Sequence, residues 1–193
     1  MDTEKIKKLR QQTGISISHC KEALEEADGD LDQAKEILQK KGEEIAESKS
    51  SREAAQGLVS AYVHNNNKLG VLLELKCESD FVAKADEFKE LSHNISLQIA
   101  SMKPKYISED DIPEDAIEKQ KEIYREQFKD TDKPEKIIKQ IIEGKIKKWY
   151  KEIVLLNQPW IKDNDLTIED LINKKVAKLG EKIKISRFCR YEI

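Results

Sequence analysis

Hydrophobic side chains alternate with polar ones on both sides of an Asn-rich stretch, Asn65–Lys68. The residues before it read Gly-Leu-Val-Ser-Ala-Tyr-Val-His, and those after it read Leu-Gly-Val-Leu-Leu-Glu-Leu-Lys-Cys-Glu. A period of two is typical of β-strands, and two such runs around a short turn predict a β-hairpin. Strands are expected at about 57–64 and 69–78. One face of the second strand then carries Val71, Leu73, Leu75 and Cys77.

The C-terminal stretch Lys-Ile-Lys-Ile-Ser-Arg-Phe-Cys-Arg-Tyr-Glu-Ile alternates in the same way. It predicts a third strand, at about 182–192, that returns to the hairpin. Its alternation puts one set of residues on a common side: Ile183, Ile185, Arg187, Cys189 and Tyr191.

The segments between the strands have helical periodicity. A helix is expected from about Asp80 to Ser101, with a stripe of Phe88, Leu91, Ile95 and Ile99, and Lys103-Pro104 stops it. Prolines at 113 and 134 open two further helices, and Gly180 ends a short one. We therefore predict an α+β core at 56–193, in which helices pack on a three-stranded antiparallel sheet.

The N-terminal residues 1–42 are expected to form a separate module of three short helices. Gly14 and Gly42 mark two helix ends, and Asp30, with Gln33 three residues later, resembles a capping box. Residues 43–55 are charged and contain serines, which is typical of a linker, extended or helical.

Composition excludes several classes of protein. The net charge of −3 gives no overall attraction to nucleic acid or membranes, and no apolar run of about 18 residues suggests a membrane span. Three isolated cysteines and no secretory leader favour the cytosol. The lysine-rich stretch Lys145–Lys151 is either a solvated helix face or, as an alternative, an RNA contact.

Motifs for catalysis and cofactor binding are missing. Asp28, Asp30 and Asp32 imitate the start of a calcium loop, but Gln33 and Gln39 stand where that loop needs Gly and Glu. The three histidines form no metal-ligand pair with cysteine, and no phosphate-binding glycine loop occurs. A Cys77 nucleophile with His64 is less plausible than a buried cysteine. We expect no enzyme activity, no cofactor and no metal.

The stretch Glu-Ser-Asp-Phe-Val-Ala-Lys, residues 78–84, follows the second strand directly. Ser79 or Asp80 would cap the helix that follows. Phe81 lies seven residues before Phe88, only about 20° away around a helix, so periodicity favours a buried ring. The alternative is that Phe81, in the first turn and at the end of the stripe, projects from the domain and enters another molecule.

The same stretch resembles the signature of the translation elongation factor Ts family. Three more stretches are similar to that family: "LRQQTGISISHCKEALEEADGDLDQA", "AAQGLVSAYVHNNNKLGVLLEL", and "LLNQPWIKD" with "SRFCRYEI". Ser79 stands where the family usually has Thr, and Ile17-Ser18-His19 stands in place of Met-Met-Asp. The family's long forms have a duplicated core, whereas this chain has one, like its short forms.

The resemblance implies a guanine-nucleotide exchange factor for elongation factor Tu, with a ubiquitin-associated-like N-terminal module. It implies that Ile17, Ser18, His19 and Cys20 dock on the GTPase. It also implies that Ser79, Asp80, Phe81, Val82, Ala83 and Lys84 approach the partner's Mg²⁺ site, and that Arg187, Phe188 and Arg190 make further contacts. A homodimer that joins two sheets is implied by the short forms. The alternative function is a ubiquitin-associated-like helical adaptor with an oligomerisation domain.

Overall fold

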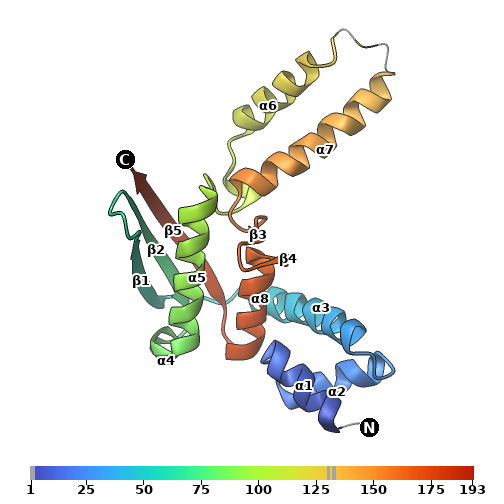
Figure 1. Ribbon diagram of the computed structural model, residues 1–193, viewed down its shortest axis with the longest axis vertical. Coiled ribbons are helices and arrows are strands. Elements are labelled where there is room, and N and C mark those ends of the chain that lie inside the picture. Colours follow the sequence, from blue (N-terminus) through green and yellow to red (C-terminus); the bar gives the residue numbers. More distant parts are fainter. Residues whose placement is uncertain (1–2, 130, 132–133) are drawn as a thin grey trace. The chain divides into compact units, whose positions relative to one another are not determined.

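The computed structural model describes residues 3–129, 131 and 134–193 (Figure 1). The chain divides into two compact units: Met1–Leu97 together with Glu169–Ile193, and Gln98–Ile168. The first unit contains the N-terminal helices and the main sheet, and the second contains a helical hairpin. None of the helices among the described residues is long and apolar enough to span a membrane.

The described part of the N-terminal segment forms α1 (Thr3–Thr13), α2 (Ile17–Glu26) and α3 (Leu31–Lys49). Gly14 follows α1 with a φ of +69°, a conformation that glycine adopts easily. The Asp30 carboxylate caps α3 by accepting hydrogen bonds from the N–H groups of the second and third residues after it, at 2.8 and 2.9 Å. The module's small core consists of Leu9, Ile15, Cys20, Ala23, Leu24, Ala27, Ala34 and Leu38. These three helices were predicted from the sequence.

The predicted end of α3 at Gly42 was wrong, because the helix continues to Lys49 through the first half of the expected linker. Gly42 is buried in the helix, and a Cβ atom there would lie 3.9 Å from the carbonyl oxygen of Asn173 in α8 (Ile168–Leu179). Packing against α8 and the helix-forming residues that follow outweigh the weak helix propensity of one glycine.

The main sheet consists of β1 (Gln56–Val63), β2 (Leu69–Cys77) and β5 (Ile183–Glu192), antiparallel and in the order β1-β2-β5. This arrangement confirms the predicted hairpin, the returning C-terminal strand and the α+β class. The inner face of β2 is fully shielded, with at most 3% exposure of Val71, Leu73, Leu75 and Cys77.

A β-bulge in β5 overturns one detail of the predicted alternation. Leu75 pairs with Ile185 but Glu74 pairs with Arg187, so Ser186 is an extra residue in the ladder. Such an insertion reverses which side chains face inward beyond it. Phe188 and Arg190 therefore lie opposite the inner-face residues Leu73 and Val71. Arg187, Cys189 and Tyr191 are on the other face and do not share one with Ile183 and Ile185.

The helix expected at about 80–101 is two helices, α4 (Asp80–Lys84) and α5 (Asp86–Met102). Ala85 separates them with an extended conformation, φ −63° and ψ 139°. The α5 stripe was predicted correctly, since Phe88, Leu91, Ile95 and Ile99 are all fully buried. The helix lies along the sheet in Figure 1, and Ser92 on α5 is 2.7 Å from Ser60 on β1, oxygen to oxygen.

The second unit contains a short 3₁₀ turn at Glu109–Asp111, α6 (Glu114–Glu126) and α7 (Glu135–Ile153). Each of these two helices follows a proline, as predicted. The two helices lie side by side (Figure 1), and the Lys145 ammonium of α7 is 5.2 and 5.1 Å from the ring centres of Tyr124 and Phe128. The small ladder of β3 (Pro159–Trp160) and β4 (Asp163–Thr167) was not predicted.

The stretch Leu-Leu-Asn-Gln-Pro-Trp has a structural role in this second unit. Gln158 is fully buried, and its side-chain amide donates to the Glu152 carbonyl at 2.8 Å. The Gln98 amide donates to the side-chain oxygen of Gln158 at 3.2 Å and to the Pro159 carbonyl at 3.0 Å. Buried amides of this kind are retained when their hydrogen bonds are satisfied. Gln158 thus has a packing role inside this unit.

Candidate functional site

The turn after β2 sets the position of the Glu-Ser-Asp-Phe-Val-Ala-Lys stretch. Ser79 is the N-cap of α4, with an extended backbone, and its hydroxyl oxygen accepts from the Val82 N–H at 3.3 Å. A serine in this role satisfies one of the free N–H groups of a first helical turn. Of the two candidates for the cap, Ser79 is the one observed, and Asp80 becomes the first helical residue.

The side chains of two glutamates hold this turn in place through hydrogen bonds. Glu181 accepts hydrogen bonds at 3.1 Å from the Glu78 N–H and at 2.9 Å from the Ser79 N–H, and it also binds the Ser79 hydroxyl. In return, Glu78 accepts from the Lys182 N–H at 2.6 Å and pairs with Arg52 at 3.5 Å. The Lys182 N–H, followed by the charge of Arg52, lowers the pKa of Glu78 below its usual range.

The outward-facing residues of α4 are charged, apart from one aromatic ring. Asp80 and Lys84 form an ion pair at 2.7 Å, one helical turn apart. The hydrogen bond and the charge of Lys84 lower the pKa of Asp80, so its carboxylate is ionised at neutral pH. Phe81 is 82% exposed, whereas Ala83 is buried and Val82 half-buried. The structure thus places the Phe81 ring outside the core, contrary to the expectation from periodicity.

The Cys77 thiol lies beneath this turn. It is fully buried and donates to the Ser79 carbonyl at 3.1 Å. Burial, with a smaller effect from the Glu181 charge, raises the pKa of Cys77 to about 11. Cys77 pairs with Gln56, whereas His64 bonds to Leu69 at the other end of the hairpin. The structure does not bring Cys77 and His64 together, and it confirms the buried cysteine that the sequence favoured over a nucleophile.

The four candidate docking residues of the N-terminal module differ in accessibility. Ile17, the first residue of α2, is 55% exposed, and Ser18 is exposed with its hydroxyl 3.1 Å from Glu22. His19 is half-buried, and Cys20 lies wholly within the module's core. Ile17 and Ser18 therefore form the accessible part of this segment, above a core that Cys20 helps to fill.

The bulge in β5 separates the three candidate contact residues near the C-terminus. The Arg187 side chain is 82% exposed and its guanidinium donates to Glu74 at 2.6 Å. Phe188 is half-buried, and Arg190, with 13% exposure of its side chain, pairs with Glu192 at 2.9 Å. Of these three residues, only Arg187 offers most of its side chain to solvent.

The outer sheet face, opposite α5, carries exposed apolar side chains. We use this term for the exposed residues Val59, Val63, Leu72 and Tyr191, whose exposures are 68, 61, 48 and 72%. Leu72 pairs with Cys189, which is half-buried on the same face. Contiguous apolar residues on one surface are typical of interaction sites.

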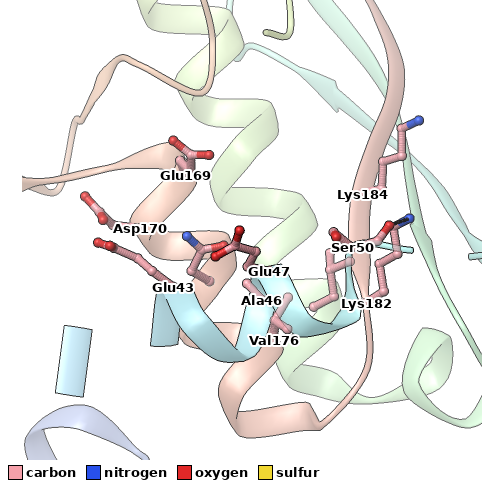
Figure 2. A pocket seen from close by; sticks show the side chains of 11 residues that line it. Glu43, Ala46, Glu47, Ser50, Glu169, Asp170, Val176, Lys182 and Lys184 are labelled. Atoms are coloured by element: carbon pink, nitrogen blue, oxygen red, sulfur yellow. Dashed lines mark hydrogen bonds between the residues drawn. The ribbon is translucent and has the colours of Figure 1, made fainter. Parts of the chain in front are cut away.

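A pocket of about 580 Å³ lies between α3, α8 and the start of β5 (Figure 2). Four acidic residues, Glu43, Glu47, Glu169 and Asp170, line it, opposite Lys182 and Lys184. Residues 78–84 do not contribute to its lining. Within the described ranges, no group of three or more His, Cys, Asp and Glu residues is arranged to hold a metal ion.

Glu181 is the residue of this site that sequence reasoning missed. It lies 102 residues from Ser79 in the chain, outside every stripe and motif that periodicity reveals. Its position in the sequence gave the one hint, since it follows the helix-ending Gly180 and comes just before the predicted C-terminal strand. An antiparallel C-terminal strand begins at the end of the sheet where β2 ends, so Glu181 is expected near Ser79.

The family model for elongation factor TS matches residues 4–193. The elongation factor Ts of Thermotoga neapolitana is 52% identical over 188 residues, covering 97% of this chain and 94% of that protein. The one from Coprothermobacter proteolyticus is 52% identical over 188 residues, with 97% and 95% covered. The one from Fervidobacterium nodosum is 49% identical over 193 residues, with 100% and 98% covered. The chain therefore belongs to the elongation factor Ts family, whose members are not enzymes but the nucleotide exchange factors of elongation factor Tu in translation elongation.

Proposed function

We propose that the chain releases GDP from elongation factor Tu by inserting Phe81, with Asp80 beside it, next to the partner's Mg²⁺ and phosphate site. The observation that carries this proposal is the 82% exposure of Phe81 at the start of a helix whose preceding turn is held by hydrogen bonds. Translation elongation is a cytoplasmic process, which agrees with the predicted location of the protein.

An exposed aromatic ring on a fixed helix start is suited to act as a wedge. Its burial in an apolar cleft of the partner removes a large area from water and so favours the complex. The movement it forces on the backbone that holds Mg²⁺ and diphosphate weakens nucleotide binding. By linkage, GDP then weakens binding of the factor by the same free energy. Exchange becomes faster while the nucleotide equilibrium of the free partner is unchanged.

The neighbouring residues of α4 assist this insertion in the proposal. Asp80 brings an ionised carboxylate toward the Mg²⁺ and phosphate site, and Lys84 holds that carboxylate in place. Val82 is half-buried and Ala83 is buried, and these two residues hold α4 on the domain. None of these roles needs a nucleotide, metal or general acid supplied by this chain.

The N-terminal module docks on the GTP-binding domain in this proposal, through Ile17 and Ser18. The exposed Ile17 side chain supplies apolar contact, and the N-terminal end of α2 lies at the same place. Cys20 and His19 shape the surface beneath them. Because docking and insertion use different surfaces, affinity depends mainly on the N-terminal module, and the rate of exchange depends mainly on α4.

We also propose that residues 1–42 are one domain and residues 56–193 another, joined by a linker at 43–55. The helix α3 continues from the first domain into this linker.

We also propose a homodimer in which two copies pair through the outer sheet face. Its support is the group of exposed apolar residues on β1, β2 and β5, which a second copy would cover. An interface of this type is isologous, because the same face is used by both subunits. Arg187 lies on this face and its charge is already balanced by Glu74.

The substitution Phe81→Ala tests the proposal. Release of fluorescent GDP from elongation factor Tu is followed by stopped flow at increasing concentrations of the factor. We expect the maximal rate to fall at least about tenfold, equivalent to a loss of about 1.4 kcal/mol. The matched control is Ile137→Ala, which trims another exposed apolar side chain, on α7. An unchanged rate with Phe81→Ala, at an unchanged circular dichroism spectrum, would disprove the insertion.

A further inference from the structure

Two turns meet where β2 and β5 stop pairing. The last pair of these strands joins Cys77 and Ile183. Beyond it, the backbone N–H groups of Glu78, Ser79 and Lys182 have no place in the ladder. Backbone donors that are partly shielded from water need acceptors, and leaving them without one is costly.

The acceptors come from two side chains, each of which serves the opposite turn. Glu181 takes the N–H groups of Glu78 and Ser79 at 3.1 and 2.9 Å, while Glu78 takes the Lys182 N–H at 2.6 Å. The two turns are therefore tied in both directions. Since a charged acceptor strengthens a hydrogen bond, this contact holds the chain firmly just before α4.

The orientation of Phe81 depends on this turn, because few side chains pack against its ring. A buried aromatic side chain is oriented by its neighbours, but this ring is 82% exposed. Its direction follows from where α4 begins, which the Ser79 hydroxyl sets by capping the Val82 N–H. Glu181 binds both the N–H and the hydroxyl of that same serine.

We infer that Glu181 is a positioning residue for nucleotide exchange, fixing Ser79 so that α4 presents Asp80 and Phe81 in one orientation. This inference rests on the proposed function of Phe81. Glu181 acts only through the turn and does not itself enter the partner. Its loss leaves Phe81 present and exposed but no longer held at the correct angle.

Three substitutions separate this role from others. Glu181→Ala removes the acceptors of all three hydrogen bonds. Glu181→Gln keeps an acceptor for both N–H groups in its amide oxygen, and it reverses the third bond, because its NH₂ donates to the Ser79 hydroxyl oxygen. Glu87→Ala is the matched control, since Glu87 pairs with Lys175 and Lys178 at 3.8 and 2.7 Å and is not bonded to residues 78–84.

The experiment is a double-mutant cycle on the full chain, with GDP release from elongation factor Tu as the signal. Misplacing a reacting group by about 1 Å costs up to about a hundredfold in rate, so we expect Glu181→Ala to lower the maximal rate about tenfold. The half-saturating concentration should stay within about twofold, because docking is unaffected. Glu181→Gln and Glu87→Ala should stay within about twofold of the wild-type rate. In the Phe81→Ala background, Glu181→Ala should have no further effect.

A wild-type maximal rate with Glu181→Ala would overturn the inference. So would an equal further loss in the Phe81→Ala background, because a general effect on stability does not depend on the ring. If Phe81→Ala alone exchanges normally, the proposed function itself fails, and this outcome is distinct from the first two. Should circular dichroism show that Glu181→Ala is unfolded, Glu181→Asp replaces it in the same cycle, with a carboxylate one methylene too short to reach the turn.

Discussion

Phe81 and Phe88 lie seven residues apart in adjoining helices, yet Phe81 is 82% exposed and Phe88 is fully buried. On one continuous helix they would share a face. The extended conformation of Ala85 ends α4 and starts α5 in a new direction, so the two rings separate. Phe88 anchors α5 to the core, while the Phe81 ring is exposed to solvent.

This contrast predicts opposite effects on stability. Phe88→Ala should lower the free energy of unfolding by about 3–5 kcal/mol, because it leaves a cavity in the core. Phe81→Ala should change it by less than about 0.5 kcal/mol, as for most exposed positions. Urea unfolding followed by circular dichroism measures both. A large loss of stability with Phe81→Ala would mean that its ring packs within the fold.

Local patterns predicted most of the fold because they report on local geometry. The alternation of Val71, Leu73 and Leu75 identified a strand with one buried face, and the spacing of Phe88, Leu91 and Ile95 identified α5. Both patterns arise directly from the backbone repeat of the element.

The departures from the prediction have causes that no local pattern contains. Ala85 is a good helix former, and only its surroundings give it an extended backbone. Ser186 becomes a bulge through its pairing with β2, and that pairing moves Phe188 and Arg190 to the inner side. Glu181 reaches Ser79 across 102 residues of chain. The candidate site was therefore found by its motif, but its geometry depends on contacts that are distant in sequence.

The buried Cys77 thiol predicts a loss of stability in alkaline solution. Its pKa is raised to about 11 in the folded chain, against about 8.5 for an unfolded cysteine. The folded state therefore holds its proton where the unfolded state has lost it, and the free energy of unfolding falls as the pH rises from about 8.5 to 11. Cys77→Ala should remove this part of the pH dependence. Equal slopes for the two proteins between those values, measured by urea unfolding, would contradict the prediction.

Exposure of Ile17 predicts that its truncation weakens docking and leaves the fold unchanged. Ile17→Ala should raise the dissociation constant for elongation factor Tu about tenfold, measured by calorimetry, as expected for an apolar contact near an interface centre. The maximal rate of GDP release should stay near the wild-type value. Ile123→Ala, which trims a comparably exposed side chain on α6, is the control and should bind normally. A point substitution is preferable to deleting residues 1–42, because α3 continues past that limit.

The exposed apolar residues of the outer sheet face predict a homodimer that a single introduced charge should disrupt. Leu72→Asp places a carboxylate among Val59, Val63 and Tyr191, where a second copy would have to bury it at high cost. Sedimentation should show the wild-type protein as a dimer and this variant as a monomer. Ile137→Asp, at an exposed position of α7, should sediment as the wild type does. Finding the wild-type protein to be a monomer at every concentration would refute the dimer.

Two glycines predict opposite responses to a single added methyl group. Gly57 has a φ of +149°, and a Cβ atom there would lie 2.2 Å from the Leu75 carbonyl oxygen, so β1 cannot keep its register beside β2. Gly57→Ala should therefore destabilise the sheet by at least about 1–3 kcal/mol, the usual range for one strained backbone residue. Gly144 is exposed within α7, and apart from the adjacent residues and the backbone of its own helix turn, no described atom would lie within 4 Å of such a Cβ. Gly144→Ala should stabilise α7 by about 1 kcal/mol through helix propensity.

Amide hydrogen exchange measures each of these two effects where it occurs. Protection should fall in β1 and β2 for Gly57→Ala and rise in α7 for Gly144→Ala. Unchanged protection in β1 would show that the strand accommodates the side chain after all.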